Sequence, residues 1–153
     1  MEDRFEMFTM HIAKISRNIR KIKTEEVAEF NLKSPHVNCL YYLYKHSGEL
    51  TAKELCDLCD EDKGAMSRSI DYLESEGYIC CSSKSEKRYK SPLNLTDKGI
   101  NVASKIATKI DNILDKASEG LSEESRINFY KSFILISDNL QKIYENYKTT
   151  DVE

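Results

Sequence analysis

Residues 51–79 read TAKELCDLCDEDKGAMSRSIDYLESEGYI and contain two short helical patterns separated by a polar turn. Thr51, with Glu54 three residues later, has the sequence of a capping box, which predicts the start of the first helix. Asp60, Glu61 and Asp62 predict the turn, with Asp62 as the cap of the second helix. Two short helices joined in this way predict a helix-turn-helix.

A hairpin is predicted directly after the second helix, which should end at Gly77. Residues 78–83 and 89–95 have the pattern of short strands, and the polar residues 85–88 suit the tip between them. Thr96 then caps a long helix. A helix-turn-helix followed at once by a hairpin indicates a winged helix-turn-helix, whose second helix enters the major groove of DNA and whose hairpin is the wing.

Long amphipathic helices are predicted at both ends of the chain. Apolar residues at steps of three and four form stripes over about residues 3–31 and 97–148. One small protomer cannot bury both stripes fully, so they predict a homodimer that is joined through the terminal helices. We therefore expect one mainly helical domain over residues 1–153, with a DNA-binding lobe over about residues 34–98.

The composition excludes several classes of protein. The chain has 153 residues, of which 40% are hydrophobic and 32% are charged, and it contains no apolar run long enough to span a membrane. The first residues do not have the pattern of a signal peptide, so we expect a cytoplasmic protein with no membrane partner. Five cysteines in such a chain favour reduced thiols over disulfides.

The candidate DNA-contacting residues lie on the second helix of the motif and on the wing. The helix candidates are Lys63, Gly64, Ser67 and Arg68. The guanidinium of Arg68 has the planar geometry that reads guanine through two hydrogen bonds, and Gly64 removes a side chain where the helix approaches DNA. The wing candidates are Lys84, Lys87, Arg88 and Lys90. Cations on a wing contact phosphates or reach into the minor groove.

The stretch from Thr51 to Gly99 resembles the core of the MarR (multiple antibiotic resistance regulator) family. The matching positions are Leu55, Ser67, Arg68, Asp71, Leu73, Glu74, Gly77, Leu93, Leu95, Thr96 and Gly99. The resemblance implies a homodimer on a palindromic operator that represses transcription until a small ligand or an oxidant is sensed. It also implies a cleft for aromatic or phenolic ligands, for which the candidate residues are Tyr41, Tyr42 and Tyr44.

The chain departs from the family pattern at two places. The family's turn often has glycine where this chain has Asp60, which predicts an aspartate in the left-handed conformation. In the wing, Tyr89 stands at the position of the family's usual arginine, Lys87 stands at that of its acid, and Arg88 lies one residue earlier than that arginine. The resemblance therefore does not determine the register of the wing.

Two other functions remain compatible with the sequence. Acidic residues slightly outnumber Lys and Arg between Thr51 and Lys98, so a winged-helix module that binds another protein is an alternative. The Cys56-x-x-Cys59 pair makes a cysteine-based redox or metal sensor of the same fold another alternative. However, Cys80 and Cys81 are adjacent strand residues that point to opposite faces and do not supply a second ligand pair, so we expect no metal and no cofactor.

An enzyme is the least favoured reading. The sequence has no phosphate-binding glycine loop, no metal-binding histidine pair and no nucleophile with a matching base. The three histidines, His11, His36 and His46, are dispersed along the chain. We therefore expect no catalytic residue.

Overall fold

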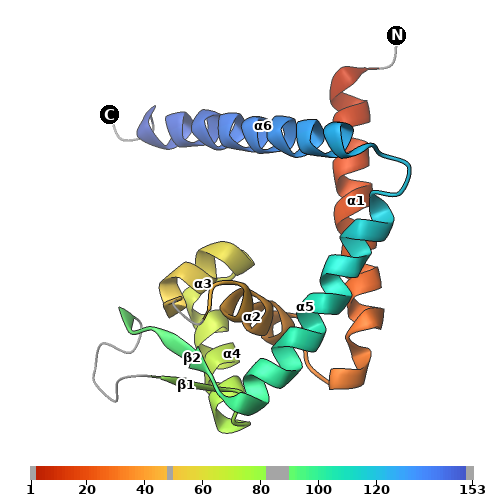
Figure 1. Ribbon diagram of the computed structural model, residues 1–153. Helices are drawn as coiled ribbons and strands as arrows, with labels where there is room; N and C mark the ends of the chain where they lie inside the picture. Colours follow the sequence, from red (N-terminus) through yellow and green to blue (C-terminus); the bar gives the residue numbers. More distant parts are fainter. Residues whose placement is uncertain (1–2, 48–49, 82–89, 151–153) are drawn as a thin grey trace. The chain divides into compact units, whose positions relative to one another are not determined.

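The computed structural model describes residues 3–47, 50–81 and 90–150. In order along the chain its elements are α1 (Arg4–Glu26), η1 (Ala28–Phe30), α2 (Ser34–Lys45), α3 (Ala52–Cys59), α4 (Lys63–Ser75), β1 (Ile79–Cys81), β2 (Leu93–Leu95), α5 (Asp97–Ala117) and α6 (Glu123–Thr150) (Figure 1). The chain forms two compact units, Met1–Leu114 and Asp115–Glu153. The expected fold class, mainly helical with a small hairpin, is confirmed.

The turn between α3 and α4 forms as its sequence predicts. Thr51 and Glu54 make both bonds of the capping box, since Glu54 Oε2 accepts from the backbone N–H of Thr51 at 2.7 Å and Thr51 Oγ1 accepts from that of Glu54 at 3.3 Å. Asp60 ends α3 with a φ of 52°, so the prediction of a left-handed aspartate is confirmed. The carboxylate of Asp62 accepts from the N–H of Ala65 at 2.8 Å and begins α4.

The hairpin strands are shorter than the sequence predicts. Strands β1 and β2 pair antiparallel over three residues each, with Ile79 opposite Leu95. The prediction that the first strand begins at Tyr78 is wrong, because its N–H donates to the carbonyl of Leu73 and closes the end of α4. Pro92, which has no N–H, forms only an isolated bridge with Thr51, so β2 begins one residue later. The predicted hairpin tip lies outside the described residues.

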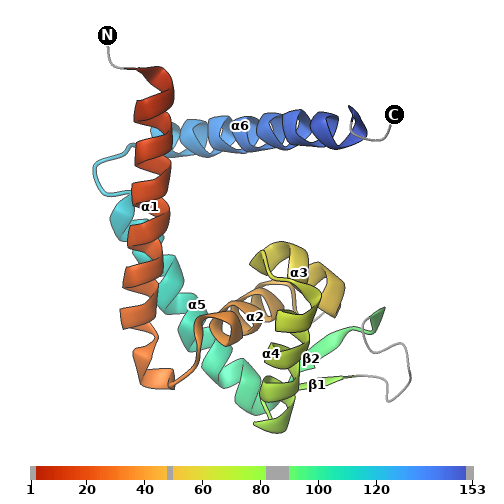
Figure 2. The ribbon, with the colours of Figure 1, turned by 180° about the vertical axis from the view of Figure 1, so that it is seen from behind.

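The core of the first unit lies between α2, α3, α4, the hairpin and α5, which the two ribbon views show packed together (Figures 1 and 2). Each of these elements contributes apolar side chains that are almost fully buried. The largest of them are Leu40, Leu43, Leu55, Met66, Leu73, Leu93 and Ile106. The backbone N–H of Leu93 also donates to the carbonyl of Leu50 at 3.0 Å, which ties the hairpin to the start of α3.

Polar contacts attach α1 to the rest of the first unit. Lys23 Nζ donates to Asn38 Oδ1 on α2 at 2.6 Å. Lys109 of α5 pairs with Glu26 and Glu29 at 3.8 and 3.2 Å. The position of α1 against the lobe is therefore set at its C-terminal end.

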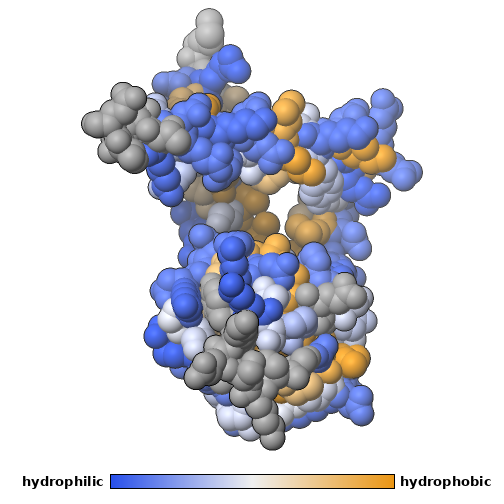
Figure 3. Space-filling model, turned by 90° about the vertical axis from the view of Figure 1, so that its left-hand side faces the viewer, coloured by the Kyte–Doolittle hydropathy of each residue, from blue (hydrophilic) through white to orange (hydrophobic). Residues whose placement is uncertain are grey.

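The second unit consists mainly of α6, whose apolar side chains are exposed. Residues of α6 that are at least half exposed include Ile134, Leu135, Leu140, Ile143, Tyr144 and Tyr147. Helix α1 also has exposed apolar side chains, and Phe5 is 75% exposed. Figure 3 shows hydrophobic residues, in orange, among the hydrophilic ones on one face of the molecule. None of the helices in the described part of the chain combines the length and the apolar character needed to cross a membrane.

Candidate nucleic-acid interface

Helix α4 has one buried face and one exposed face. Met66, Ile70 and Leu73 are between 0% and 4% exposed and pack into the core. All four candidate DNA-contacting residues of this helix are exposed, namely Lys63, Gly64, Ser67 and Arg68. The structure thus places the predicted side chains together near the start of α4, on the side that faces away from the core.

Gly64 provides space for the side chains on either side of it. A Cβ atom at this position would lie 3.2 Å from Asp62 Oδ1, which caps the helix, and 3.5 Å from Nη1 of Arg68. Within the described part of the chain Arg68 takes part in no ion pair. Its guanidinium therefore lies over the start of α4 with its donors available to a partner.

A pocket of about 400 Å³ lies beside Arg68, between the start of α2 and the adjacent side of α4. Its lining residues are Asn31, Lys33, Pro35, His36, Ala65, Arg68, Ser69 and Tyr72. Two of them are cations and none is an acid, so the pocket favours an anionic group. No local sequence pattern predicts this pocket, because its two walls come from segments that are far apart in the chain.

His36 forms one wall of this pocket. Its imidazole stacks on the ring of Tyr72, with 4.2 Å between the ring centroids and an angle of 10°, and the residue is only 8% exposed. Burial and the neighbouring Lys33 hold the pKa of His36 below its ordinary value. Its Nδ1 atom is buried and has no hydrogen-bond partner among the described residues. The pocket therefore contains a neutral imidazole with an unused polar atom.

The base of the hairpin is held by residues of the matching motif at the start of α5. Gly99 is required there, since a Cβ would lie 1.9 Å from the backbone oxygen of Tyr78. Lys98 Nζ donates to the carbonyl of Glu76 at 2.7 Å and lies over the ring of Tyr78. These contacts fix the end of α4 against α5 and orient the hairpin relative to the exposed face of α4.

The structure describes only one of the four wing candidates. Lys90 is exposed and lies three residues before β2. Lys84, Lys87 and Arg88 lie outside the described residues, as does the position of Tyr89. The described cations among the candidates are therefore Lys63 and Arg68 of α4 and Lys90.

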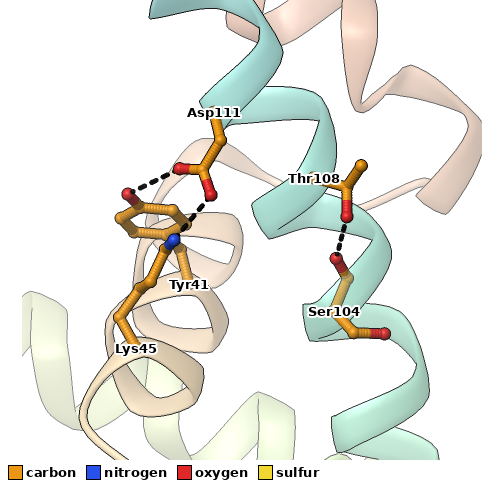
Figure 4. A network of polar contacts seen from close by, with 5 residues as sticks. All are labelled: Tyr41, Lys45, Ser104, Thr108 and Asp111. Atoms are coloured by element: carbon orange, nitrogen blue, oxygen red, sulfur yellow. Dashed lines mark hydrogen bonds and ion pairs between the residues drawn. The ribbon is translucent and has the colours of Figure 1, made fainter.

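The tyrosine candidates lie elsewhere in the lobe and do not line the pocket beside Arg68. The hydroxyl of Tyr41 donates to Asp111 of α5 at 3.4 Å, and Lys45 pairs with the same carboxylate at 2.6 Å (Figure 4). Burial and Asp111 raise the pKa of Tyr41. Tyr42 is half-buried and Tyr44 is exposed. The structure thus gives Tyr41 a contact that links α2 to α5, and its ring lies edge-on to that of Tyr42, with 5.3 Å between the ring centroids.

The remaining candidate ligands are dispersed. His11 is exposed on α1 and His46 is exposed directly after the end of α2, and Cys56 and Cys59 are both half-buried on α3. No group of three or more His, Cys, Asp or Glu side chains among the described residues is arranged to hold a metal ion.

Comparison with known proteins agrees with this geometry. Residues 30–88 match the model of the MarR family. The structure is similar to that of NMB1585, a MarR family regulator from Neisseria meningitidis, with a TM-score of 0.77, 19% sequence identity and coverage of 94% of this chain and 99% of that one. The resemblance to the MarR family is confirmed. A search of the curated proteins gives no match.

Two further structures with a similar fold are complexes. One is a complex of Staphylococcus aureus MepR with DNA, with a TM-score of 0.75, 17% identity and coverage of 90% of this chain and 99% of that one. The other is Staphylococcus aureus MarR in complex with salicylate and kanamycin, with a TM-score of 0.74, 18% identity and coverage of 91% and 96%. The likeness extends over nearly the whole length of these chains and shows the MarR fold.

The part that matches the MarR family model contains α4 and all the lining residues of the pocket, whereas Lys90 lies outside it. It begins at Phe30, just before the pocket, and includes α2, α3, α4 and β1. Helices α1, α5 and α6 lie outside it, so their likeness to the family comes from the structural comparison. The MarR match therefore coincides with the lobe that presents the exposed face of α4.

Proposed function

We propose that this chain is a non-enzymatic transcription regulator that acts in the cytoplasm and binds duplex DNA through α4 and the wing. The observation that supports this proposal most directly is the exposed start of α4, where Lys63, Ser67 and Arg68 project from a helix whose opposite face is buried. A helix presented in this way after a tight turn is the element that enters the major groove in winged helix-turn-helix proteins.

Each side chain of this face has a distinct role in the proposed complex. Arg68 donates two hydrogen bonds to the edge of a guanine, and Ser67 contacts a base or a phosphate. Gly64 allows the helix start to approach the DNA closely. Lys63, Lys90 and Lys33, the last at the mouth of the pocket beside Arg68, neutralise backbone phosphates. The wing residues Lys84, Lys87 and Arg88 add phosphate or minor-groove contacts.

The proposed active form is a homodimer. The apolar side chains of α1 and α6 that are exposed in the single chain supply a surface for a second copy. Two-fold symmetry then presents one α4 to each half of a palindromic operator. Occupation of a promoter in this manner would repress transcription by excluding polymerase.

The proposed effector is a small aromatic molecule. The Staphylococcus aureus MarR complex with salicylate and kanamycin supports such a ligand for this fold. Tyr41, Tyr42 and Tyr44 are the proposed binding residues, and Tyr41 is suited to transmit the effect because its hydroxyl links α2 to Asp111 on α5. A ligand causes release of DNA only if its affinity is higher for the arrangement of the protein that cannot bind DNA than for the arrangement that can.

Selection of binding sites from random duplex DNA tests the proposal. We expect enrichment of a palindrome that the protein binds with a dissociation constant of about 10⁻⁸ M or tighter, and with an affinity that falls steeply as the salt concentration rises. A folded dimer that enriches no sequence would contradict the proposal and would favour a module that binds another protein.

A further inference from the structure

The first turn of α2 lines the pocket beside Arg68 and leaves a backbone donor free. Lys33, the N-cap of this helix, makes no side-chain capping bond, and Pro35 stands in the first turn. The backbone N–H of His36 makes no hydrogen bond to another described residue, because the first N–H groups of a helix have no carbonyl one turn earlier. Such N–H groups and the helix dipole favour an anion at the start of α2.

Two nearly buried polar side chains line the same pocket. His36 is 8% exposed and Ser69 is 6% exposed. The Nδ1 atom of His36 has no hydrogen-bond partner among the described residues, and the stack on Tyr72 keeps the imidazole in place. Buried polar groups in folded proteins are almost always paired, so an unpaired one indicates a partner that comes from outside the chain. This observation is independent of the helix start and indicates a ligand at the same place.

The charges around the pocket also favour an anion. Lys33 comes from the start of α2 and Arg68 comes from α4, and none of the described residues that line the pocket is acidic. A guanidinium presents two parallel donors that match a phosphate or a carboxylate, and an ammonium adds a point charge. The volume of about 400 Å³ is within the range of small-molecule sites, so the pocket can hold an anionic group together with part of the molecule that carries it.

We propose that this pocket binds a phosphate group between the start of α2 and α4. Arg68 donates two hydrogen bonds to one pair of oxygens, and the backbone N–H of His36 donates to a third oxygen. Lys33 neutralises part of the charge at the mouth of the pocket. A tetrahedral phosphate presents oxygens toward both helices, whereas a planar carboxylate presents only two, so donors on two helices favour phosphate.

Two sources can supply the phosphate group. One is the backbone of duplex DNA, and this source rests on the proposed function. Arg68 has five N–H donors, so one edge of its guanidinium can hold the phosphate while another reads a base. The other source is inorganic phosphate or a small phosphorylated molecule, which would place an anion beside the exposed face of α4 and weaken its attraction for DNA.

Titration of the free protein tests the site without any use of DNA. Inorganic phosphate and sulfate are added to the full-length chain at constant ionic strength, with chloride as the reference, and NMR follows the imidazole nitrogens of the three histidines. We expect saturable shifts of His36 with a dissociation constant of about 1 mM. His11 and His46 are exposed and do not line the pocket, so their signals should stay unchanged.

Matched variants assign the binding to this pocket. Lys33→Ala and Arg68→Ala each remove one cation from an exposed position, so both should fold, and each should weaken binding at least about tenfold. Lys53→Ala removes the same charge from an exposed position of α3 that does not line the pocket, and it should bind the anions as the wild type does. Equal weakening in all three variants would show nonspecific attraction and would overturn the proposal.

Backbone substitution in the selected operator identifies the source. Neutral methylphosphonates replace single phosphates along each half-site, and the affinities of the wild type and of Lys33→Ala are compared. If DNA supplies the phosphate, one replacement should weaken binding by the wild type and have little effect on Lys33→Ala, and the salt slope of this variant should be smaller by about 0.9. If a free anion occupies the pocket, phosphate should weaken operator binding more than chloride does at equal ionic strength, and Lys33→Ala should lose this difference.

The two measurements together decide the proposal. It is overturned if neither anion shifts His36 in the free protein and no methylphosphonate position distinguishes Lys33→Ala from the wild type. If the protein selects no DNA, the proposed function fails, while titration of the free protein by itself decides whether the pocket binds phosphate.

Discussion

The hydroxyl of Thr96 donates to the carbonyl oxygen of Gly77 at 2.6 Å. The hydroxyl oxygen of Thr96 in turn accepts from the N–H of Gly99 at 3.1 Å and caps α5. One side chain therefore closes the end of the α4 segment and begins the next long helix. The angle between the hairpin and α4 depends on this connection, since both strands of the hairpin lie between Gly77 and Thr96.

Removal of this hydroxyl should destabilise the lobe. We expect Thr96→Val to lower the free energy of unfolding by about 1–3 kcal/mol, because the variant removes the bond to the Gly77 carbonyl and leaves the part-buried N–H of Gly99 without its partner. Denaturant unfolding measures this. Thr108→Val is the control, since the Thr108 hydroxyl bonds only to the Ser104 carbonyl of its own helix and is exposed (Figure 4). Equal losses in the two variants would contradict the role of Thr96.

A side chain at position 99 should be poorly tolerated. The Cβ of Gly99→Ala would meet the backbone oxygen of Tyr78 at 1.9 Å, and a backbone atom cannot turn away as a flexible side chain can. We expect a loss of about 1–3 kcal/mol or more in the free energy of unfolding, as for an overpacked core. Asn101→Ala, at an exposed position of the same helix, should have a much smaller effect. A stable Gly99→Ala protein would show that α5 can move away from the hairpin.

The capping box predicts a loss of stability in acid. Hydrogen bonds from the backbone N–H and the hydroxyl of Thr51 lower the pKa of Glu54 from its ordinary value of 4.5. The unfolded chain therefore takes up this proton first as the pH falls, and the contribution to stability is lost as the pH falls through the folded pKa. Glu54→Gln keeps an oxygen acceptor but does not titrate. Its urea midpoint should fall less than that of the wild type between about pH 6 and pH 3.5, and parallel midpoints would contradict this.

Protonation of His36 should cause a second loss of stability, at a higher pH than that of Glu54. Because burial and Lys33 lower its pKa, the folded state favours the neutral imidazole, and stability is lost as the pH falls below the ordinary value of 6.5 and through the folded pKa. His36→Phe retains a ring that can stack on Tyr72 and cannot titrate. Between about pH 7.5 and pH 5.5 the variant should lose less free energy of unfolding than the wild type. The prediction fails if both proteins lose the same amount.

Arg68 should contribute to sequence recognition. We expect Arg68→Ala to weaken binding to the selected operator by about 1–3 kcal/mol and to relax the preference at one base position. Arg20→Ala changes the net charge equally at an exposed position of α1 and serves as the control. If the two variants weaken binding alike, Arg68 contributes only charge and does not read a base.

The contacts that the sequence predicts correctly are short-range. The capping box of Thr51 and Glu54 and the left-handed Asp60 each depend on atoms within a few residues, so the local pattern is enough to specify them. The exposed side of α4 follows from helical periodicity in the same way. The hairpin bounds were less accurate, because the N–H of Tyr78 pairs with the end of α4 and Pro92 bridges to Thr51.

The sequence by itself determined the helices, the turn and the face of α4 on which Arg68 lies, because these depend on interactions between neighbours along the chain. The tertiary structure alone decided which distant residues meet. Thr96 and Gly77 are 19 residues apart, His36 stacks on Tyr72 from another helix, and Cys39 Sγ lies 3.5 Å from Sδ of Met66 on another helix. These contacts depend on how whole elements pack, and packing is set by the combined burial of many apolar side chains, which no short segment encodes.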